Sequence, residues 1–200
     1  MTLLLSRRAV LVCGGAALSL GTAAPPAFAV SLSEAERLVD RLVADVNAVI
    51  ASGKSESRML DDFEKIFQAY ADVPTIARYS LGSDARSASP AQLAAYTDAF
   101  ATYIARKYGR RFREFIGGRI EVLEARNVPN GVEVQTTAIL VGQSPFRVDF
   151  WVSDASGRTK FFNIIIEGVN MLLSERSEIQ AMLDQRRRDI DRLIADLPQV

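Results

Sequence analysis

The stretch RIEVLEARNVPNGVEVQTTAILV, residues 119–141, decides the fold class of this chain. On both sides of its centre, apolar and polar residues alternate with a period of two, as in β-strands that bury one face. Pro129, Asn130 and Gly131 separate the two runs, and an Asn-Gly pair in that position is a strong hairpin signal. Because helical spacings dominate before this stretch, the chain changes here from helices to an antiparallel sheet.

Two further strands are predicted after the hairpin. In residues 146–153, alternation separates an apolar face (Phe146, Val148, Phe150, Val152) from a polar one (Arg147, Asp149, Trp151). Residues 158–168 are apolar on both faces around Phe162 to Ile166, so this strand should be covered on both sides. Together with the hairpin they predict a four-stranded antiparallel sheet.

Helices are predicted before and after the strands along the chain. Ser33 and Glu36 have the spacing of a capping box, and the helix they begin ends near Gly53. A second helix follows, and Asp72 before Pro74 begins a short third one that stops at Gly82. The remaining helix signals are Ser89, Pro90 and Gln92, which begin a helix ending near Gly117 and Gly118, and apolar spacing from about Ser174 to Leu197.

These elements predict one α+β domain. In it, N-terminal helices and a long C-terminal helix pack on the four-stranded sheet and enclose an apolar cavity. Neither a repeat nor a low-complexity linker divides residues 30–200.

Bulky side chains at helical spacing raise the question of what they face. An amphipathic helix needs an apolar face for ordinary core packing. Large rings on both the helices and the sheet could instead hold the two layers apart and line a cavity. The residues expected to line it are Phe63, Phe67, Tyr70, Phe100, Tyr103, Ile104, Phe112, Val134, Phe146, Val148, Phe150, Phe162, Ile164 and Ile166.

Cations cluster towards the end of the helix that begins at Ser89. One interpretation is a solvated face near a helix C-terminus, where positive charge is favoured. The other is a collar that attracts a phosphate headgroup or an anionic membrane surface. The residues concerned are Arg106, Lys107, Arg110 and Arg111, with Arg147 from the sheet.

Residues 1–29 have the pattern of an export signal. Two arginines precede an uncharged apolar run, and Ala27-Phe28-Ala29 places small residues where signal peptidase reads. Ser6-Arg7-Arg8 also resembles a twin-arginine signal, so the twin-arginine and Sec routes both stay open. We therefore expect an exported protein that begins at Val30.

Composition excludes several classes of function. The chain has no histidine, and its one cysteine, Cys13, lies in the expected signal, so a Ser/His/Asp or Cys/His arrangement cannot form. Without His and Cys ligands, only carboxylate metal sites would be possible, and we predict neither a metal nor a cofactor. Removal of Arg7 and Arg8 leaves a net charge of −2, which argues against a general nucleic-acid binder.

Two blocks of short motifs carry a family resemblance. The first block consists of Ala77, Arg78, Leu81, Gly82, Ser89, Pro90, Gln92, Phe100 and Tyr108. The second consists of Glu167, Gly168, Val169, Arg176, Asp191, Leu193, Ile194 and Leu197. Together they resemble the MlaC, or toluene-tolerance, family of periplasmic phospholipid-binding proteins. The sequence departs from the pattern in four places: Asp84-Ala85 replaces a tryptophan, Asn163 an aspartate, Asn170 a serine and Arg188 a glycine.

The resemblance implies a carrier and no catalytic residue. Such a protein holds a lipid by its acyl chains and shuttles it between an outer-membrane lipoprotein complex and an inner-membrane ABC transporter with an Mce-domain protein. A phospholipid and another membrane lipid, such as a hopanoid, both fit.

Two other functions compete with the carrier. A small isomerase-like or dehydratase-like enzyme could use Asp149 as a desolvated base, although alternation places Asp149 beside Arg147 and Trp151, away from the apolar face. An exported adaptor would have a filled core and no cavity.

Overall fold

The computed structural model describes residues 30–109 and 116–200, and it has the predicted α+β fold. The expected signal, residues 1–29, lies outside the described residues, as do Arg110, Arg111 and Phe112. The helices are α1 (Leu32–Ile50), α2 (Glu56–Tyr70), α3 (Val73–Leu81), α4 (Pro90–Gly109), α5 (Met171–Gln185) and α6 (Ile190–Asp196), with short 3-10 helices η1 (Asp84–Arg86) and η3 (Leu197–Gln199). The strands are β1 (Arg119–Val128), β2 (Gly131–Ile139), β3 (Phe146–Ser153), β4 (Lys160–Ile166) and β5 (Val169–Asn170).

The strands form one antiparallel sheet in the order β1-β2-β3-β4-β5, and the predicted hairpin joins β1 to β2. Val128 pairs with Gly131, so the two loop residues are Pro129 and Asn130. Asn130 has a φ of 73°, a left-handed conformation that asparagine tolerates better than most residues.

The predicted strand count was wrong by one. After β4 the chain reverses through Glu167 and Gly168, which have φ values of 49° and 79°. Val169 and Asn170 then pair with Ile166 and Ile165 as the two-residue strand β5. Gly168 makes this reversal easy because it has no Cβ to clash at positive φ.

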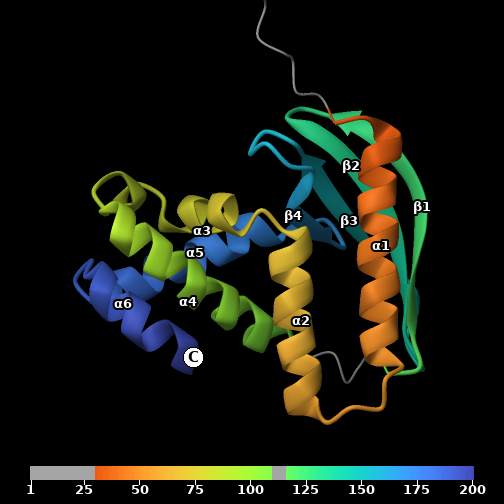
Figure 1. Cartoon of the computed structure of the whole chain (residues 1–200), viewed down its shortest axis with the longest axis horizontal. Coiled ribbons are helices and arrows are strands. Elements are labelled where there is room, and N and C mark those ends of the chain that lie inside the picture. Colours follow the sequence, from red (N-terminus) through yellow and green to blue (C-terminus); the bar gives the residue numbers. More distant parts are fainter. Residues whose placement is uncertain (1–29, 110–115) are drawn as a thin grey trace, which may run out of the picture.

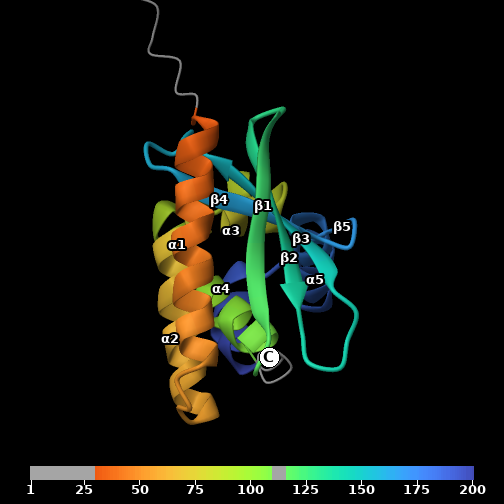
Figure 2. The ribbon, with the colours of Figure 1, turned by 90° about the vertical axis from the view of Figure 1, so that its right-hand side faces the viewer.

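The sheet register confirms the predicted apolar face of β3. Phe150 lies opposite Val134, and Val148 lies opposite Thr136, so these side chains share one face of the sheet. Helix α1 runs along β1 and β2 on this side (Figures 1 and 2). Val148, Phe150 and Val152 are all buried.

Helix starts follow the predicted capping chemistry with one shift. The capping box of α1 is Ser31 with Glu34, not Ser33 with Glu36. Val30 directly before it is buried, which anchors the entry of the chain two residues earlier than predicted. Asp72 caps α3 as predicted, accepting a hydrogen bond from the Thr75 amide at 3.3 Å.

The start of α4 is also as predicted. Gln92 accepts from the Ser89 amide at 3.0 Å, and the Gln92 amide donates to the Ser89 hydroxyl at 3.2 Å. The described part of this helix ends at Gly109, so its predicted end near Gly117 is not tested.

The predicted long C-terminal helix was wrong, because the chain breaks it into α5 and α6. Arg187 and Arg188 have φ values of 55° and 63°, which no α-helix accommodates. The Arg188 amide donates to the Leu183 carbonyl at 2.8 Å, which closes the end of α5. Asp189 then caps α6 by accepting from the Arg192 amide at 3.0 Å.

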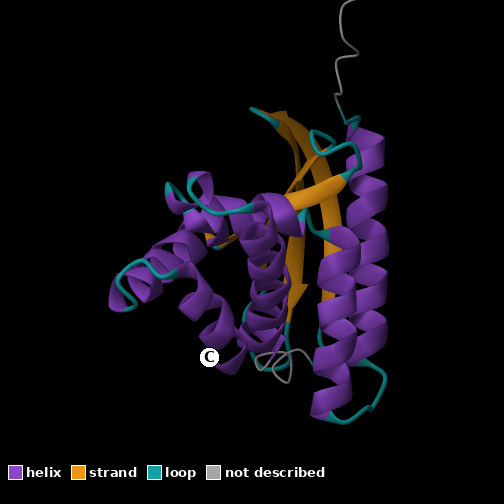
Figure 3. Ribbon diagram, turned by 60° about the vertical axis from the view of Figure 1, so that its left-hand side comes forward, coloured by secondary structure: helices purple, strands orange, loops and turns teal. Residues whose placement is uncertain are grey.

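Helices α3, α4, α5 and α6 pack together at one end of the molecule, and α2 lies between them and α1 (Figures 1 and 3). Helix α5 also contacts β4. None of the helices in residues 30–109 and 116–200 is long and apolar enough to cross a membrane.

Candidate functional site

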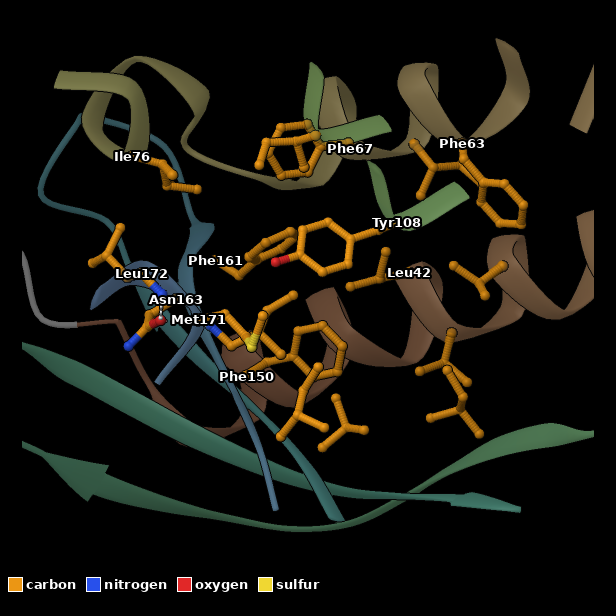
Figure 4. Close-up of a pocket in the computed structure, with 18 of the residues that line it drawn as sticks. Leu42, Phe63, Phe67, Ile76, Tyr108, Phe150, Phe161, Asn163, Met171 and Leu172 are labelled. Carbon is orange, nitrogen blue, oxygen red and sulfur yellow. Dashed lines mark hydrogen bonds between the residues drawn. The ribbon is translucent and has the colours of Figure 1, made fainter. Parts of the chain in front are cut away.

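A pocket of about 620 Å³ lies between the helices and the apolar face of the sheet (Figure 4). Side chains from α1, α2, α3, α4 and α5 meet side chains from the strands around it. Its walls are almost wholly apolar. The predicted residues that line it are Phe63, Phe67, Ile104, Phe146, Val148, Phe150, Phe162, Ile164 and Ile166.

Four other predicted residues lie elsewhere. Phe100 is fully buried between Tyr96 and Tyr103, among packed helices. Val134 is on the apolar face of the sheet but does not reach the pocket. Tyr70 and Tyr103 do not line the pocket either, and their hydroxyls donate hydrogen bonds to Asp45 at 2.6 Å and to Glu178 at 2.8 Å, respectively. The fifth, Phe112, lies outside the described residues.

Phe161 is the aromatic residue of the wall that strand alternation missed. Its ring lies 6.1 Å from that of Phe67 and 5.7 Å from that of Phe150, centroid to centroid. A register shift beside Trp151 and Val152 pairs Val152 with Phe161 and turns it to the inner face. A bulge of this kind has no sequence signal in simple alternation.

Helix residues at ordinary core spacing complete the wall. Tyr108 on α4, a residue of the family motif that is not among the predicted pocket residues, also lines the pocket (Figure 4). Further residues that sequence reasoning left in the core are Leu42, Val43 and Val46 from α1, Ile66 from α2, Ile76 from α3, and Met171 and Leu172 from α5.

Besides the exposed Gln143, two polar side chains interrupt the apolar wall. The side-chain oxygen Oδ1 of Asn163 accepts hydrogen bonds from the backbone amide of Leu172 at 3.1 Å and from that of its neighbour Ile164 at 2.9 Å. Asn163 is therefore satisfied by backbone donors and helps to begin α5.

Glu175 is the second polar group and is only partly satisfied. One carboxylate oxygen accepts from the Lys107 ammonium at 2.7 Å and from the Tyr108 hydroxyl. The other oxygen is buried and has no hydrogen-bond partner in residues 30–109 and 116–200. A buried acceptor without a donor is costly, so a ligand donor or a water molecule would stabilise it.

Burial and nearby charges shift the pKa values of two groups in the cluster around Glu175. Burial raises the pKa of Tyr103 far above its ordinary value, and the charges of Glu175 and Glu178 add to this effect. Burial opposes ionisation of Glu178, but hydrogen bonds from Lys107 and Tyr103 outweigh it and lower the pKa of Glu178. The cluster thus keeps Tyr103 neutral and Glu178 ionised beside the Lys107 ammonium group.

The MlaC protein family matches residues 36–199, which is most of the chain. The chain belongs to the MlaC family.

A solved structure supports the same fold for this MlaC-family chain. The phospholipid-binding protein from Ralstonia solanacearum, solved in complex with a phospholipid, aligns with a TM-score of 0.70 and 19% identity. The alignment covers 82% of this chain and 95% of that chain. At this level of identity the likeness concerns the fold.

Three of the five predicted cationic residues of this MlaC-family chain have partners within the protein. Arg106 donates to the Pro198 carbonyl, and Lys107 bridges Glu175 and Glu178. Arg147 pairs with Asp149 at 2.9 Å on the sheet. Arg110 and Arg111 lie outside the described residues.

Asp149 does not face the pocket. It lies on the opposite face of β3 from Phe150 and is buried under its bidentate contact with Arg147. Among the described residues no group of three His, Cys, Asp or Glu side chains could hold a metal ion.

Proposed function

We propose that this MlaC-family protein is a lipid carrier whose pocket shields the acyl chains of a phospholipid or a related membrane lipid. The observation that supports this best is the apolar pocket of about 620 Å³ between the helices and the sheet. Pockets that bury small ligands commonly measure about 300–1,000 Å³. The Ralstonia solanacearum protein of the same fold was solved with a phospholipid bound, which agrees with the proposal.

Energetics explain why an enclosed route is needed. Moving a methylene group out of water is worth about 0.8 kcal/mol, so two chains of ~16 carbons represent roughly 25 kcal/mol. Free lipid in water is therefore negligible. Transfer from a bilayer into an apolar pocket exchanges one apolar environment for another, so the direction of transport must come from partners.

The polar part of the cargo is proposed to lie near Glu175 and Lys107. The Glu175 oxygen that has no partner among the described residues can accept a hydrogen bond from a hydroxyl or ammonium group, and Lys107 pairs with the other oxygen at 2.7 Å. Arg106, Arg110, Arg111 and Arg147 remain proposed as contacts for a headgroup or a membrane surface.

Location and partners are inferred from the family and from the N-terminal sequence. We propose that residues 1–29 direct export to the periplasm. There the protein would exchange lipid with an outer-membrane lipoprotein complex and with an inner-membrane ABC transporter that has an Mce-domain protein.

The pocket favours the carrier over the two alternatives. An adaptor needs no apolar hollow of this size. An enzyme with Asp149 as its base would need that carboxylate in the pocket, whereas Arg147 holds it on the other face of the sheet. Membership of a family of binding and transport proteins also favours the carrier.

The first test is mass spectrometry of the protein purified from cells, under native conditions and after solvent extraction. We expect one phospholipid, or one related membrane lipid, per chain. A protein that is free of lipid and also takes up none from vesicles would contradict the proposal.

A pair of neighbouring substitutions tests the pocket itself. Ile164→Asp places a charge in the wall, where ionised carboxylates are strongly disfavoured, and should abolish lipid retention. Ile165→Asp is the matched control, because Ile165 pairs with Asp149 on the other face and does not line the pocket. Equal lipid content in the two folded variants would show that the pocket does not hold the lipid.

A further inference from the structure

Three arginines converge on a second hollow, which the lipid carrier does not explain. It has a volume of about 560 Å³ and lies against α3, η1 and α5. Arg78, Arg86 and Arg176 line it, together with Tyr79 and Gly82. Arg78, Gly82 and Arg176 are also motif residues of the family resemblance, yet none of them lines the lipid pocket.

Helices α3 and α5 separate the two hollows. On α3, Ile76 lines the lipid pocket, whereas Thr75 and Tyr79 line the arginine hollow. On α5, Leu172 lines the lipid pocket, whereas Arg176 lines the arginine hollow. A lipid held by its chains in the first pocket therefore does not account for the second.

The charge of the arginine hollow is not compensated. No ion pair joins Arg78, Arg86 or Arg176 to a carboxylate in the described part of the chain. The acidic residue of η1, Asp84, is paired with Arg188 instead and does not line the hollow.

Arg176 is held in place by stacking, and none of the described residues provides its guanidinium group with a hydrogen-bond acceptor. Its guanidinium group stacks 4.9 Å above the centre of the Tyr79 ring. Gly82 leaves room for it, because a Cβ there would lie 3.2 Å from a guanidinium nitrogen of Arg176. A positioned guanidinium fork is suited to bidentate contacts with a carboxylate or phosphate.

We propose that this hollow binds an acidic segment of a partner protein through carboxylate side chains. Three guanidinium groups around a concave surface match a protruding carboxylate better than a flat bilayer. The residues that line the hollow include no large exposed aliphatic side chain that would insert into a membrane. The site is independent of the lipid pocket, so this proposal and the carrier function can be tested separately.

Binding of the peptide acetyl-Glu-Glu-Gly-Glu-Glu-amide to the purified protein tests the site. Titration at low salt, followed by NMR of the arginine side chains, should shift the signals of Arg78, Arg86 and Arg176. Affinity should fall at 0.2 M salt, because exposed charges are screened. The variant with all three arginines changed to glutamine should bind at least about tenfold more weakly, because charge-assisted contacts are lost.

A control variant and a second arginine variant accompany this test. Arg58→Gln removes an exposed cation from α2, outside both hollows, and should leave peptide affinity unchanged. If the triple variant unfolds, the pair Arg78→Gln and Arg86→Gln serves instead, since both side chains are exposed. An affinity that is absent in the wild type, or equal in wild type and variant, would overturn the site. Arginine-dependent binding to phosphatidylglycerol vesicles without peptide binding would overturn the assignment to a protein partner.

Discussion

Residues that depart from the family pattern have ion-pair or hydrogen-bond partners in this chain. Asp84, in place of a tryptophan, pairs with Arg188, in place of a glycine. Asn163 and Asn170 both accept amide hydrogen bonds from the first turn of α5, from Leu172 and Leu173 at 3.1 Å each. The asparagines keep the acceptor that a helix start requires, without placing a charge beside the pocket.

At the residue scale, Glu133 is a buried carboxylate that three donors hold. It accepts from Arg126 at 2.7 Å, from Gln135 at 3.1 Å and from Trp151 at 3.0 Å. Burial alone would raise the pKa of Glu133, but these hydrogen bonds and the charge of Arg126 outweigh it and lower the pKa.

Glu133→Gln should therefore destabilise the protein by about 1–3 kcal/mol at neutral pH. A lowered pKa gives stability that is present above the ordinary value of 4.5 and is lost as the pH falls through the folded-state value. Urea unfolding at pH 7, 5, 4 and 3 measures the difference in the free energy of unfolding between wild type and variant. This gap should shrink below pH 4.5. A gap that is constant across this range would show that the ionised form is not the stabilising one.

At the element scale, the break between α5 and α6 rests on two arginines with positive φ. The left-handed conformation costs a residue with a Cβ about 1–2 kcal/mol. The side chain of Arg187 is exposed, and within the described residues it has no hydrogen bond or ion pair. Arg188 reaches Asp184 at 2.6 Å and Gln180 at 2.8 Å, in addition to Asp84.

Arg187→Gly should stabilise the protein by about 1 kcal/mol, because it relieves the backbone and removes no contact. In differential scanning calorimetry this corresponds to an increase in Tm of about 2–4 °C. Arg188→Gly relieves the same strain but removes two ion pairs, so its gain should be smaller. A larger gain for Arg188→Gly would contradict this account of the helix break.

At the scale of the whole molecule, cargo and stability should be coupled. If a lipid fills the pocket of about 620 Å³, it binds only the folded chain and raises the free energy of unfolding. At a lipid concentration one hundred times the Kd, the gain is about 2.7 kcal/mol, which corresponds to an increase in Tm of roughly 5–10 °C.

Calorimetry before and after removal of lipid by unfolding in denaturant and refolding measures this coupling. We expect the delipidated protein to melt lower and to recover its Tm when vesicles are added. The Ile164→Asp variant is the control, since its Tm should not respond to vesicles. A wild-type Tm that is unaffected by delipidation would argue against a cargo in this pocket.

The sequence by itself determined the strand faces and several helix starts, because neighbours along the chain decide them. Alternation predicted the apolar face of β3, and capping residues such as Asp72 and Ser89 predicted where helices begin. Tertiary contacts decided which bulky side chains meet. Phe63 lines the pocket whereas Phe100 fills the core, although both lie on apolar helix faces.

The same physical reason explains what only the folded chain reveals. The shift that turns Phe161 inward depends on pairing between two strands. The environment of Glu175, one of whose oxygens has no partner among the described residues, depends on side chains from α4. Arg78 and Arg176 are far apart in the sequence and meet because α3 packs against α5. Periodicity reports only on neighbours within a few residues, whereas each of these features is made by segments that meet through packing.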